Sequence, residues 1–121
     1  MPSSARFVVL ISAKFEWQSV LQQVQPNQLS SSPYGEFFLH TLADFPVIFM
    51  HAGWGKVSTA GASQFAIDSF HPQLLINLGT CGGLEGLVEL GEILLITETA
   101  FYDIYEGMGD PAQAVDFYRS K

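Results

Sequence analysis

A short apolar run that breaks into a glycine-rich turn constrains this chain most. Leu74–Leu78 is almost entirely apolar and lies between Pro72 and Gly79, which is the pattern of a buried strand. Gly79–Gly83 then contains three glycines in five positions, so the backbone can take positive φ and a flat ligand can approach closely. In open α/β sheets, ligands bind beyond the carboxyl ends of the strands. The turn is therefore a candidate binding floor. The alternative is a tight turn that needs glycine for its shape alone.

Further apolar runs predict the strands that accompany this one. Phe7–Ile11, Val47–His51 and Ile93–Thr97 are strand-like, and Glu36–Leu42 is predicted to form a hairpin with Val47–His51 through Ala43–Pro46. These runs alternate in part with helical patterns. The sequence therefore predicts an α/β fold, a three-layer sandwich with a central mixed sheet.

Two helices are predicted between these strands. In the first, Phe15, Val20, Leu21 and Val24 recur at roughly helical spacing until Pro26. The second runs from about Lys56 to Phe70 and ends at His71-Pro72. The remaining predictions are a loop at Ser30–Pro33, a connection at Leu84–Gly91 and a short terminal helix at Ala112–Arg119.

The length and composition of the chain predict one domain that associates with another chain. A chain of 121 residues suffices for one compact domain, predicted to span residues 1–121. The sequence is 48% hydrophobic but only 14% charged, and so few charges leave little to cover the surface of a domain. We therefore expect another chain to cover part of the apolar surface, most simply in a homodimer or a higher homo-oligomer.

Charge and cysteine content limit the partners and the compartment. The formal net charge is −7, and the five basic residues are dispersed along the chain, so no basic patch is available to bind nucleic acid. No apolar run is long enough to span a bilayer, and the N-terminus lacks the apolar core of a signal peptide. The single cysteine, Cys81, cannot form an internal disulfide. A cytoplasmic protein that contacts no membrane is the prediction.

Four segments, in order, resemble a known family. Asn77–Gly83 is similar to the Asn-x-Gly-[Ser/Thr]-[Ala/Cys]-Gly-Gly segment of the nucleoside phosphorylase superfamily, most closely to its 5′-methylthioadenosine/S-adenosylhomocysteine nucleosidases. Val8–Glu16 resembles the first strand and a turn with a catalytic glutamate, and His51–Val57 resembles the Ser-Gly-x-Gly-Lys-Val segment. Gly91–Ile96, together with Phe101–Asp103, resembles the strand and aromatic turn that follow. The resemblance covers only the first half of that family's fold.

The resemblance implies a site. Glu16 would activate the attacking water, and Trp54 would contact the 5′ tail of a nucleoside. Thr80, Cys81 and Gly82 would line the nucleoside. The residues alone leave alternatives open: Glu16 also fits a charge that caps the N-terminus of a helix, and a tryptophan between two glycines also fits a core position.

Neither a phosphate co-substrate nor a metal is expected. Phosphorolytic members resembling this chain have a phosphate-binding arginine at the position of Asn77, which cannot supply that charge. Water is therefore the expected nucleophile. His40, His51 and His71 lack metal-ligand spacing with Cys81, and His51 is predicted to be structural. No cofactor is predicted.

The resemblance therefore implies a purine-nucleoside N-ribosyl hydrolase acting on an adenine nucleoside. In the family, a second glutamate holds the ribose and an aspartate protonates the purine, and neither has a matching motif here. Glu106, Asp110 and Asp116 are acidic but lie in different surroundings. We expect the chain to be incomplete and weakly active by itself, and whether it is an enzyme stays open. The alternatives are a non-catalytic nucleoside-binding or assembly module and an unrelated flavodoxin-like ligand domain.

Overall fold

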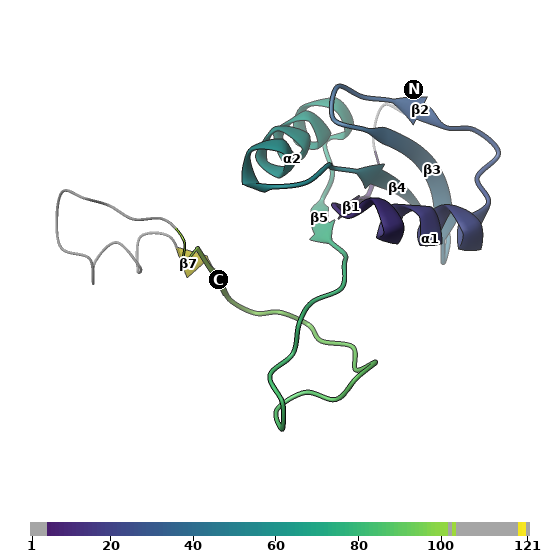
Figure 1. Cartoon of the computed structure of the whole chain (residues 1–121). Coiled ribbons are helices and arrows are strands. Elements are labelled where there is room, and N and C mark those ends of the chain that lie inside the picture. Colours follow the sequence, from purple (N-terminus) through teal and green to yellow (C-terminus); the bar gives the residue numbers. More distant parts are fainter. Residues whose placement is uncertain (1–4, 102, 104–118, 121) are drawn as a thin grey trace, which may run out of the picture. The chain divides into compact units, whose positions relative to one another are not determined.

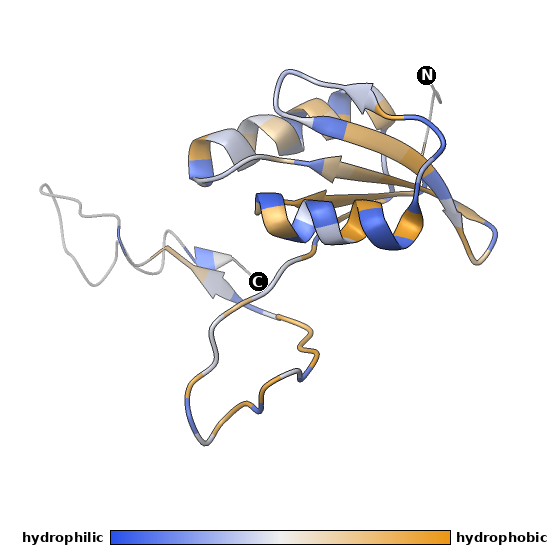
Figure 2. Ribbon diagram, turned by 45° about the vertical axis from the view of Figure 1, so that its right-hand side comes forward, coloured by the Kyte–Doolittle hydropathy of each residue, from blue (hydrophilic) through white to orange (hydrophobic). Residues whose placement is uncertain are grey.

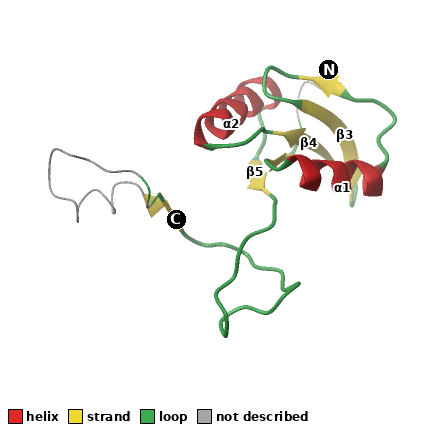
Figure 3. Cartoon of the chain, in the orientation of Figure 1, coloured by secondary structure: helices red, strands yellow, loops and turns green. Residues whose placement is uncertain are grey.

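The computed structural model describes residues 5–101, 103, 119 and 120 of the chain (Figure 1). The chain divides into two units, Met1–Cys81 and Gly82–Lys121, which we call the first and the second unit. Helices and most of the strands belong to the first unit (Figure 3). Within the described residues, neither helix has the length and apolar character needed to cross a membrane.

The first unit is built on a five-stranded mixed sheet. Its strands are β1 (Phe7–Ile11), β2 (Ser30–Ser31), β3 (Glu36–Leu42), β4 (Phe45–His51) and β5 (Leu74–Asn77). Their order across the sheet is β2-β3-β4-β1-β5. β1 is parallel to both β4 and β5, whereas β3 is antiparallel to β2 and β4. The predicted mixed sheet is confirmed, with β1 at the centre of its parallel part.

Two helices cover opposite faces of this sheet. Alternate side chains of β1 and β4 pack with Trp17 of α1 (Lys14–Val24) on one face, in a cluster that includes Val9 and Phe49. The other alternate set, which includes Val8, packs with α2 (Lys56–Phe70) on the opposite face. Figure 2 shows the strands as the most hydrophobic part of this unit. A strand buried on both faces reads as a continuous apolar run, so the three-layer sandwich predicted from these runs is confirmed.

Both helices end where the sequence predicts. α1 ends at Val24, and Gln25 takes the left-handed conformation, with φ 48°, before Pro26. α2 ends at Phe70, and His71 is left-handed, with φ 47°. Proline disfavours helical backbone at the residue before it, so Pro72 accounts for the end of α2.

The predicted hairpin is confirmed, with a tighter turn than expected. Ala43 and Asp44 both have positive φ, 45° and 68°, and Leu42 pairs with Phe45. Positive φ at both central residues is typical of the two-residue turn whose twist suits antiparallel strands. The loop is therefore two residues long, and β4 begins at Phe45 instead of Val47.

Two predictions about strands are wrong. Ile93–Thr97 is irregular and exposed, because a strand needs a hydrogen-bonded neighbour and the described residues pair none with it. Ser30–Ser31, predicted as loop, pairs with β3 as β2. The connection at Leu84–Gly91 is confirmed.

The second unit contains one short ladder. β6 (Thr99–Ala100) pairs antiparallel with β7 (Arg119–Ser120). A salt bridge of 2.8 Å joins Arg119 Nε to Glu98 Oε1. The predicted terminal helix, Ala112–Arg119, lies outside the described residues except for Arg119, which belongs to β7.

Candidate functional site

The candidate site lies where three parallel strands end. The parallel pairing of β1 with β4 and β5 places their carboxyl ends at one edge of the sheet. Main-chain hydrogen bonds from Ala52 N–H to Ile11 O and from Leu78 N–H to Leu10 O, both 2.9 Å, carry the pairing just past β4 and β5. The three loops that follow are therefore held side by side, which is where α/β sheets bind ligands.

A pocket of about 270 Å³ opens between these loops. It is lined by Ser12, Ala13, Glu16, Trp54, Gly55, Asn77, Leu78, Gly79 and Thr80. Three of the five predicted site residues, Glu16, Trp54 and Thr80, are thus brought together from segments far apart in the sequence. We call this cavity the polar pocket.

Glu16 and Thr80 form the central contact of the polar pocket. Glu16 Oε1 accepts hydrogen bonds from the main-chain N–H of Thr80 at 2.7 Å and from its hydroxyl at 2.6 Å. Bonds to an ionised acceptor are short and strong. They fix the carboxylate although the two residues are 64 positions apart in the sequence.

The other oxygen of Glu16 is less engaged. Oε2 accepts a hydrogen bond from the N–H of Ala13 at 3.3 Å, which is longer than either bond to Oε1. That contact belongs to the helix N-terminus, so Glu16 has the capping role considered from the sequence in addition to the bridge to Thr80. Since Oε1 already accepts two short bonds, Oε2 is the oxygen with capacity for a further partner.

The hydrogen bonds also set the ionisation of Glu16. Burial raises the pKa of Glu16, but the bonds from the Thr80 hydroxyl, the Thr80 N–H and the Ala13 N–H outweigh it, so the pKa lies below its ordinary value. Hydrogen bonds to the charged form favour that form. Glu16 is therefore a carboxylate at neutral pH.

Gly79 allows the close approach of Glu16 to the turn after β5. A Cβ at this position would lie 3.2 Å from Glu16 Oε2 and 3.3 Å from Oε1. Those distances are tighter than most Cβ contacts, so a larger residue would require the carboxylate to shift by a few tenths of an ångström. The sequence left two reasons open for glycine in this turn, the approach of a flat ligand and the shape of the turn; the structure adds that the Glu16 carboxylate lies against Gly79.

Trp54 lies in the loop between β4 and α2. Gly53 and Gly55 on either side have φ 71° and 87°, a conformation that glycine takes without strain. The hydroxyl of Ser58 donates to the carbonyl of Ala52 at 2.9 Å and so holds the start of the loop. Trp54 is 76% exposed while it lines the polar pocket, which excludes the core position that the sequence left open.

Cys81 and Gly82 are not brought into the polar pocket. Cys81 is a free, exposed cysteine that is not among the residues lining the pocket. Gly82 belongs to the second unit. Their predicted contacts with a nucleoside therefore stay predictions. In the sequence, Asn77 served only as evidence against a phosphate-binding arginine. In the structure, Asn77 lines the pocket.

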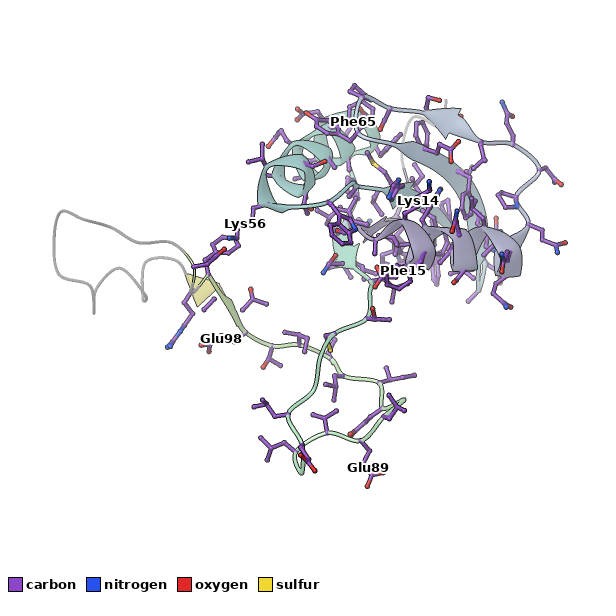
Figure 4. The ribbon with its side chains drawn as sticks, in the orientation of Figure 1. Lys14, Phe15, Lys56, Phe65, Glu89 and Glu98 are labelled. Atoms are coloured by element: carbon purple, nitrogen blue, oxygen red, sulfur yellow. The ribbon has the colours of Figure 1, made fainter. Side chains whose placement is uncertain are left out.

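A second, apolar pocket of about 300 Å³ adjoins the same bridge. It is lined by Ile11, Phe15, Glu16, Ser19, Val20, Leu78, Gly79 and Thr80. Glu16 and Thr80 line both pockets and lie between a polar and an apolar cavity. The sequence analysis missed the apolar pocket; the signal was the apolar Phe15 beside Glu16 on the first turn of α1 (Figure 4).

The ring of His51 packs against a buried aromatic side chain. Its ring stacks on that of Trp17, with centroids 5.8 Å apart and an angle of 14°. Trp17 is buried and donates from Nε1 to Glu36 Oε2 at 3.3 Å. This agrees with the structural role predicted for His51, and Trp17 is a core residue that the sequence analysis did not single out. Among the described residues, no group of three His, Cys, Asp or Glu side chains could hold a metal ion.

Comparison with known proteins places this geometry in a family. The pattern of the phosphorylase superfamily matches residues 6–119. The 5′-methylthioadenosine/S-adenosylhomocysteine nucleosidase of Psychromonas ingrahamii is 32% identical over 96 residues, which cover 78% of this chain and 42% of that protein. The nucleosidase of Aeromonas salmonicida is 31% identical over 111 residues, which cover 85% of this chain and 48% of the relative.

Solved structures agree. The nucleosidase from Neisseria meningitidis, in complex with methylthio-immucillin-A, is 28% identical with a TM-score of 0.69, and the match covers 83% of this chain and 44% of that one. The Colwellia psychrerythraea nucleosidase, in complex with adenine, has a TM-score of 0.69 at 23% identity, and the match covers 93% of this chain and 49% of that one. At this identity the likeness is evidence for the fold alone. The chain thus spans about half the length of the relatives it matches. Since the family pattern matches nearly the whole sequence and the folds agree, the chain is a member of the phosphorylase superfamily.

Proposed function

We propose that this chain carries the water-activating part of a purine-nucleoside N-ribosyl hydrolase site. The observation that supports this most is the Glu16 carboxylate, held at Oε1 by two bonds from Thr80 of 2.7 and 2.6 Å. A general base must be ionised and fixed in place. Glu16 meets both requirements, and within the part of the chain that the structure describes a single bond, of 3.3 Å, engages Oε2.

The proposed chemistry is a displacement by water at the ribose. The water oxygen bonds to C1′ as the bond from C1′ to the purine nitrogen breaks, and the bonding electron pair leaves with the purine. Glu16 Oε2 takes the proton from the water. The purine takes a proton from a general acid, which the resemblance places on a segment without a match here. A positioned acid or base contributes roughly 10²–10⁴ in rate.

The polar pocket favours water over phosphate as the nucleophile. Neither arginine nor lysine is among the described residues that line it, and by the family resemblance Asn77 lies at the position where phosphorolytic members have arginine. A phosphate ion next to the Glu16 carboxylate would need a cation to offset the repulsion. A neutral water molecule has no such requirement.

The proposed substrate class is the adenine nucleosides. The relatives are named for 5′-methylthioadenosine and S-adenosylhomocysteine, and the two solved neighbours bind an immucillin analogue and adenine. In this chain, the exposed indole of Trp54 beside the polar pocket is suited to the apolar part of such a ligand.

We further propose that the protein is a homodimer in the cytoplasm. Trp54 and Val57, the latter 89% exposed, lie three positions apart around the start of α2 and give a small apolar surface. A two-fold dimer would bury this surface against its copy. The compartment rests on the single free cysteine, which suits a reducing environment. Sedimentation of a monomer at micromolar concentrations would contradict the dimer.

The function is tested by binding and turnover together. We expect calorimetric titration with 5′-methylthioadenosine to show binding to the 121-residue chain, and Trp54→Ala to weaken it about tenfold, or roughly 1.4 kcal/mol. Adenine release from 5′-methylthioadenosine, S-adenosylhomocysteine and adenosine should stay near background, because we expect this chain to lack the general acid.

Two results would change this proposal. Absence of binding to all three nucleosides would contradict it. Turnover of about 1 s⁻¹ that Glu16→Gln abolishes would support the hydrolase and contradict the expected lack of an acid. Asp103 would then be one residue to test for that role. Binding without Glu16-dependent turnover, even in a completed fold, would favour the alternative of a non-catalytic binding module.

A further inference from the structure

A tight turn between β2 and β3 reaches the elements that carry Trp54. Ser32 closes this turn, because its N–H and its hydroxyl both donate to the carbonyl oxygen of Gly35 at 2.8 Å. The Ser32 hydroxyl also accepts from the N–H groups of Tyr34 and Gly35, at 3.2 and 3.1 Å. Serine bonds of this kind fix the backbone of a turn. We call residues 32–35 the Tyr34 turn.

The ring of Tyr34 lies on α2. A Cβ at Gly61 would come within 2.5 Å of Tyr34 Cε1, so the ring fills the space that a side chain at Gly61 would need. The ring also approaches Phe65, one helical turn further along, with centroids 6.3 Å apart. Phe65 packs against the buried residues between α2 and the sheet, which we call the α2 cluster. The Tyr34 turn is therefore anchored on α2, beside which it passes in Figure 1.

The same turn abuts the end of β4. The main chain of Gly35 lies against His51, because a Cβ on Gly35 would collide with the carbonyl oxygen of His51. Two residues after His51, a Cβ on Gly53 would lie 3.6 Å from the carbonyl oxygen of Tyr34, an ordinary contact distance. His51 ends β4, and Gly53 belongs to the loop that carries Trp54. The Tyr34 turn thus contacts the elements on both sides of this loop.

The loop at residues 52–55 depends on these two elements for its position. Gly53 and Gly55 flank Trp54, and glycine has the greatest backbone freedom of all residues. The indole is 76% exposed, so burial in the core does not hold it. The position of the indole therefore follows the placement of the start of α2 relative to the end of β4.

We propose that Tyr34 is a positioning residue for Trp54. By packing on Gly61 while its turn abuts the end of β4, Tyr34 sets the spacing of the two elements and, with it, the place of the indole in the polar pocket. The geometric part of this inference concerns the first unit alone. Its consequence for nucleoside binding rests on the proposed function.

The test follows the indole of Trp54 directly. The chain contains two tryptophans, Trp17 and Trp54, so labelling with fluorotryptophan gives two fluorine NMR signals. Trp54→Phe assigns them by removing one. Trp17 is buried against the sheet, and its signal reports whether each variant keeps the fold.

Two variants act on the contact from opposite sides. Tyr34→Ala removes the ring, whereas Gly61→Ala keeps the ring and displaces it with the new Cβ. Alanine favours a helix more than glycine does, so Gly61→Ala does not weaken α2 itself. Tyr34→Phe retains the ring. Ile67→Ala is the matched control on α2, since Ile67 is 45% exposed and Tyr34 is 37% exposed.

We expect Tyr34→Ala and Gly61→Ala to shift the Trp54 signal, and Tyr34→Phe and Ile67→Ala to leave it in place. Gly61→Ala should add no shift once Tyr34 is replaced by alanine, because the two side chains then no longer meet. A Trp54 signal that both Tyr34→Ala and Gly61→Ala leave unchanged would overturn the proposal. An equal shift in Ile67→Ala would overturn it as well. Should Tyr34→Ala also disturb the Trp17 signal, Gly61→Ala decides.

Nucleoside binding gives the readout that depends on the proposed function. Tyr34→Ala should bind 5′-methylthioadenosine about threefold more weakly than the unchanged chain, because a freed indole must be ordered again on binding. Tyr34→Phe should restore the affinity. Equal binding by Tyr34→Ala would overturn the role of Tyr34 in nucleoside binding. Absence of binding by the unchanged chain would contradict the proposed function alone, and the fluorine signals would still decide whether Tyr34 positions Trp54.

Discussion

The two units use similar apolar residues in opposite ways. In the first unit, the strands and helices bury theirs in two clusters, one on each face of the sheet. In the second unit, Leu90 and Ile93 are almost fully exposed and Leu87 is 77% exposed. The difference shows that an apolar run specifies a strand only when another element supplies a face and a hydrogen-bonding edge for it.

Proteolysis should show the largest difference between the units. Local opening ranges from about zero free energy to that of global unfolding, roughly 5–15 kcal/mol. We expect chymotrypsin to cleave after Leu84, Leu87 and Leu90 at least about 10³-fold faster than within residues 7–77. Mass spectrometry of a time course identifies the order of the cuts. Equal rates in the two units would break the comparison.

The next largest expected difference is in the stability loss caused by truncating an isoleucine in each unit. Ile48 is 0% exposed in the α2 cluster and Ile93 is 96% exposed in the second unit. Ile48→Ala should lower the free energy of unfolding by about 2–5 kcal/mol through lost burial and a new cavity. Ile93→Ala should change it by less than about 0.5 kcal/mol. Urea unfolding followed by tryptophan fluorescence measures both, and similar losses would mean that Ile93 is buried in solution.

The smallest effect concerns the bridge between Glu16 and Thr80. Because the pKa of Glu16 is lowered in the folded chain, its contribution is present above the unfolded pKa of about 4.3 and is lost as the pH falls through the folded value. Since the bridge is exposed, we expect a contribution of less than about 1 kcal/mol.

A double-mutant cycle isolates this contribution. Glu16→Gln, Thr80→Val and the double variant are unfolded in urea at pH 7 and pH 3.5. The coupling between the two positions should be present at pH 7 and weaker at pH 3.5. Additive effects at pH 7 would show that the bridge does not stabilise the first unit. Gly79→Ala should reduce the coupling as well, because its Cβ would crowd the carboxylate and require it to shift.

Much of the first unit was predictable because local signals and tertiary packing agree there. Helical spacing, Pro26 and Pro72 set the two helices, and the apolar runs set β1, β4 and β5. The prediction of a strand at Ile93–Thr97 used the same kind of signal and was wrong. Its apolar pattern carried no information about whether a neighbouring strand is within reach. Likewise, β2 has no apolar signal, and its pairing with β3 alone makes it a strand.

The candidate site, too, was predictable only in part from the sequence. The sequence by itself determined the residue types at the ends of the strands: a carboxylate at Glu16, an indole at Trp54 and a hydroxyl at Thr80. Only the tertiary structure decided that Glu16 and Thr80 meet, that Oε1 is engaged more strongly than Oε2, and that Gly79 gives the carboxylate its room. Local sequence sets backbone conformation over a few residues. The parallel pairing of β1 with β5 then closes a separation of 64 residues.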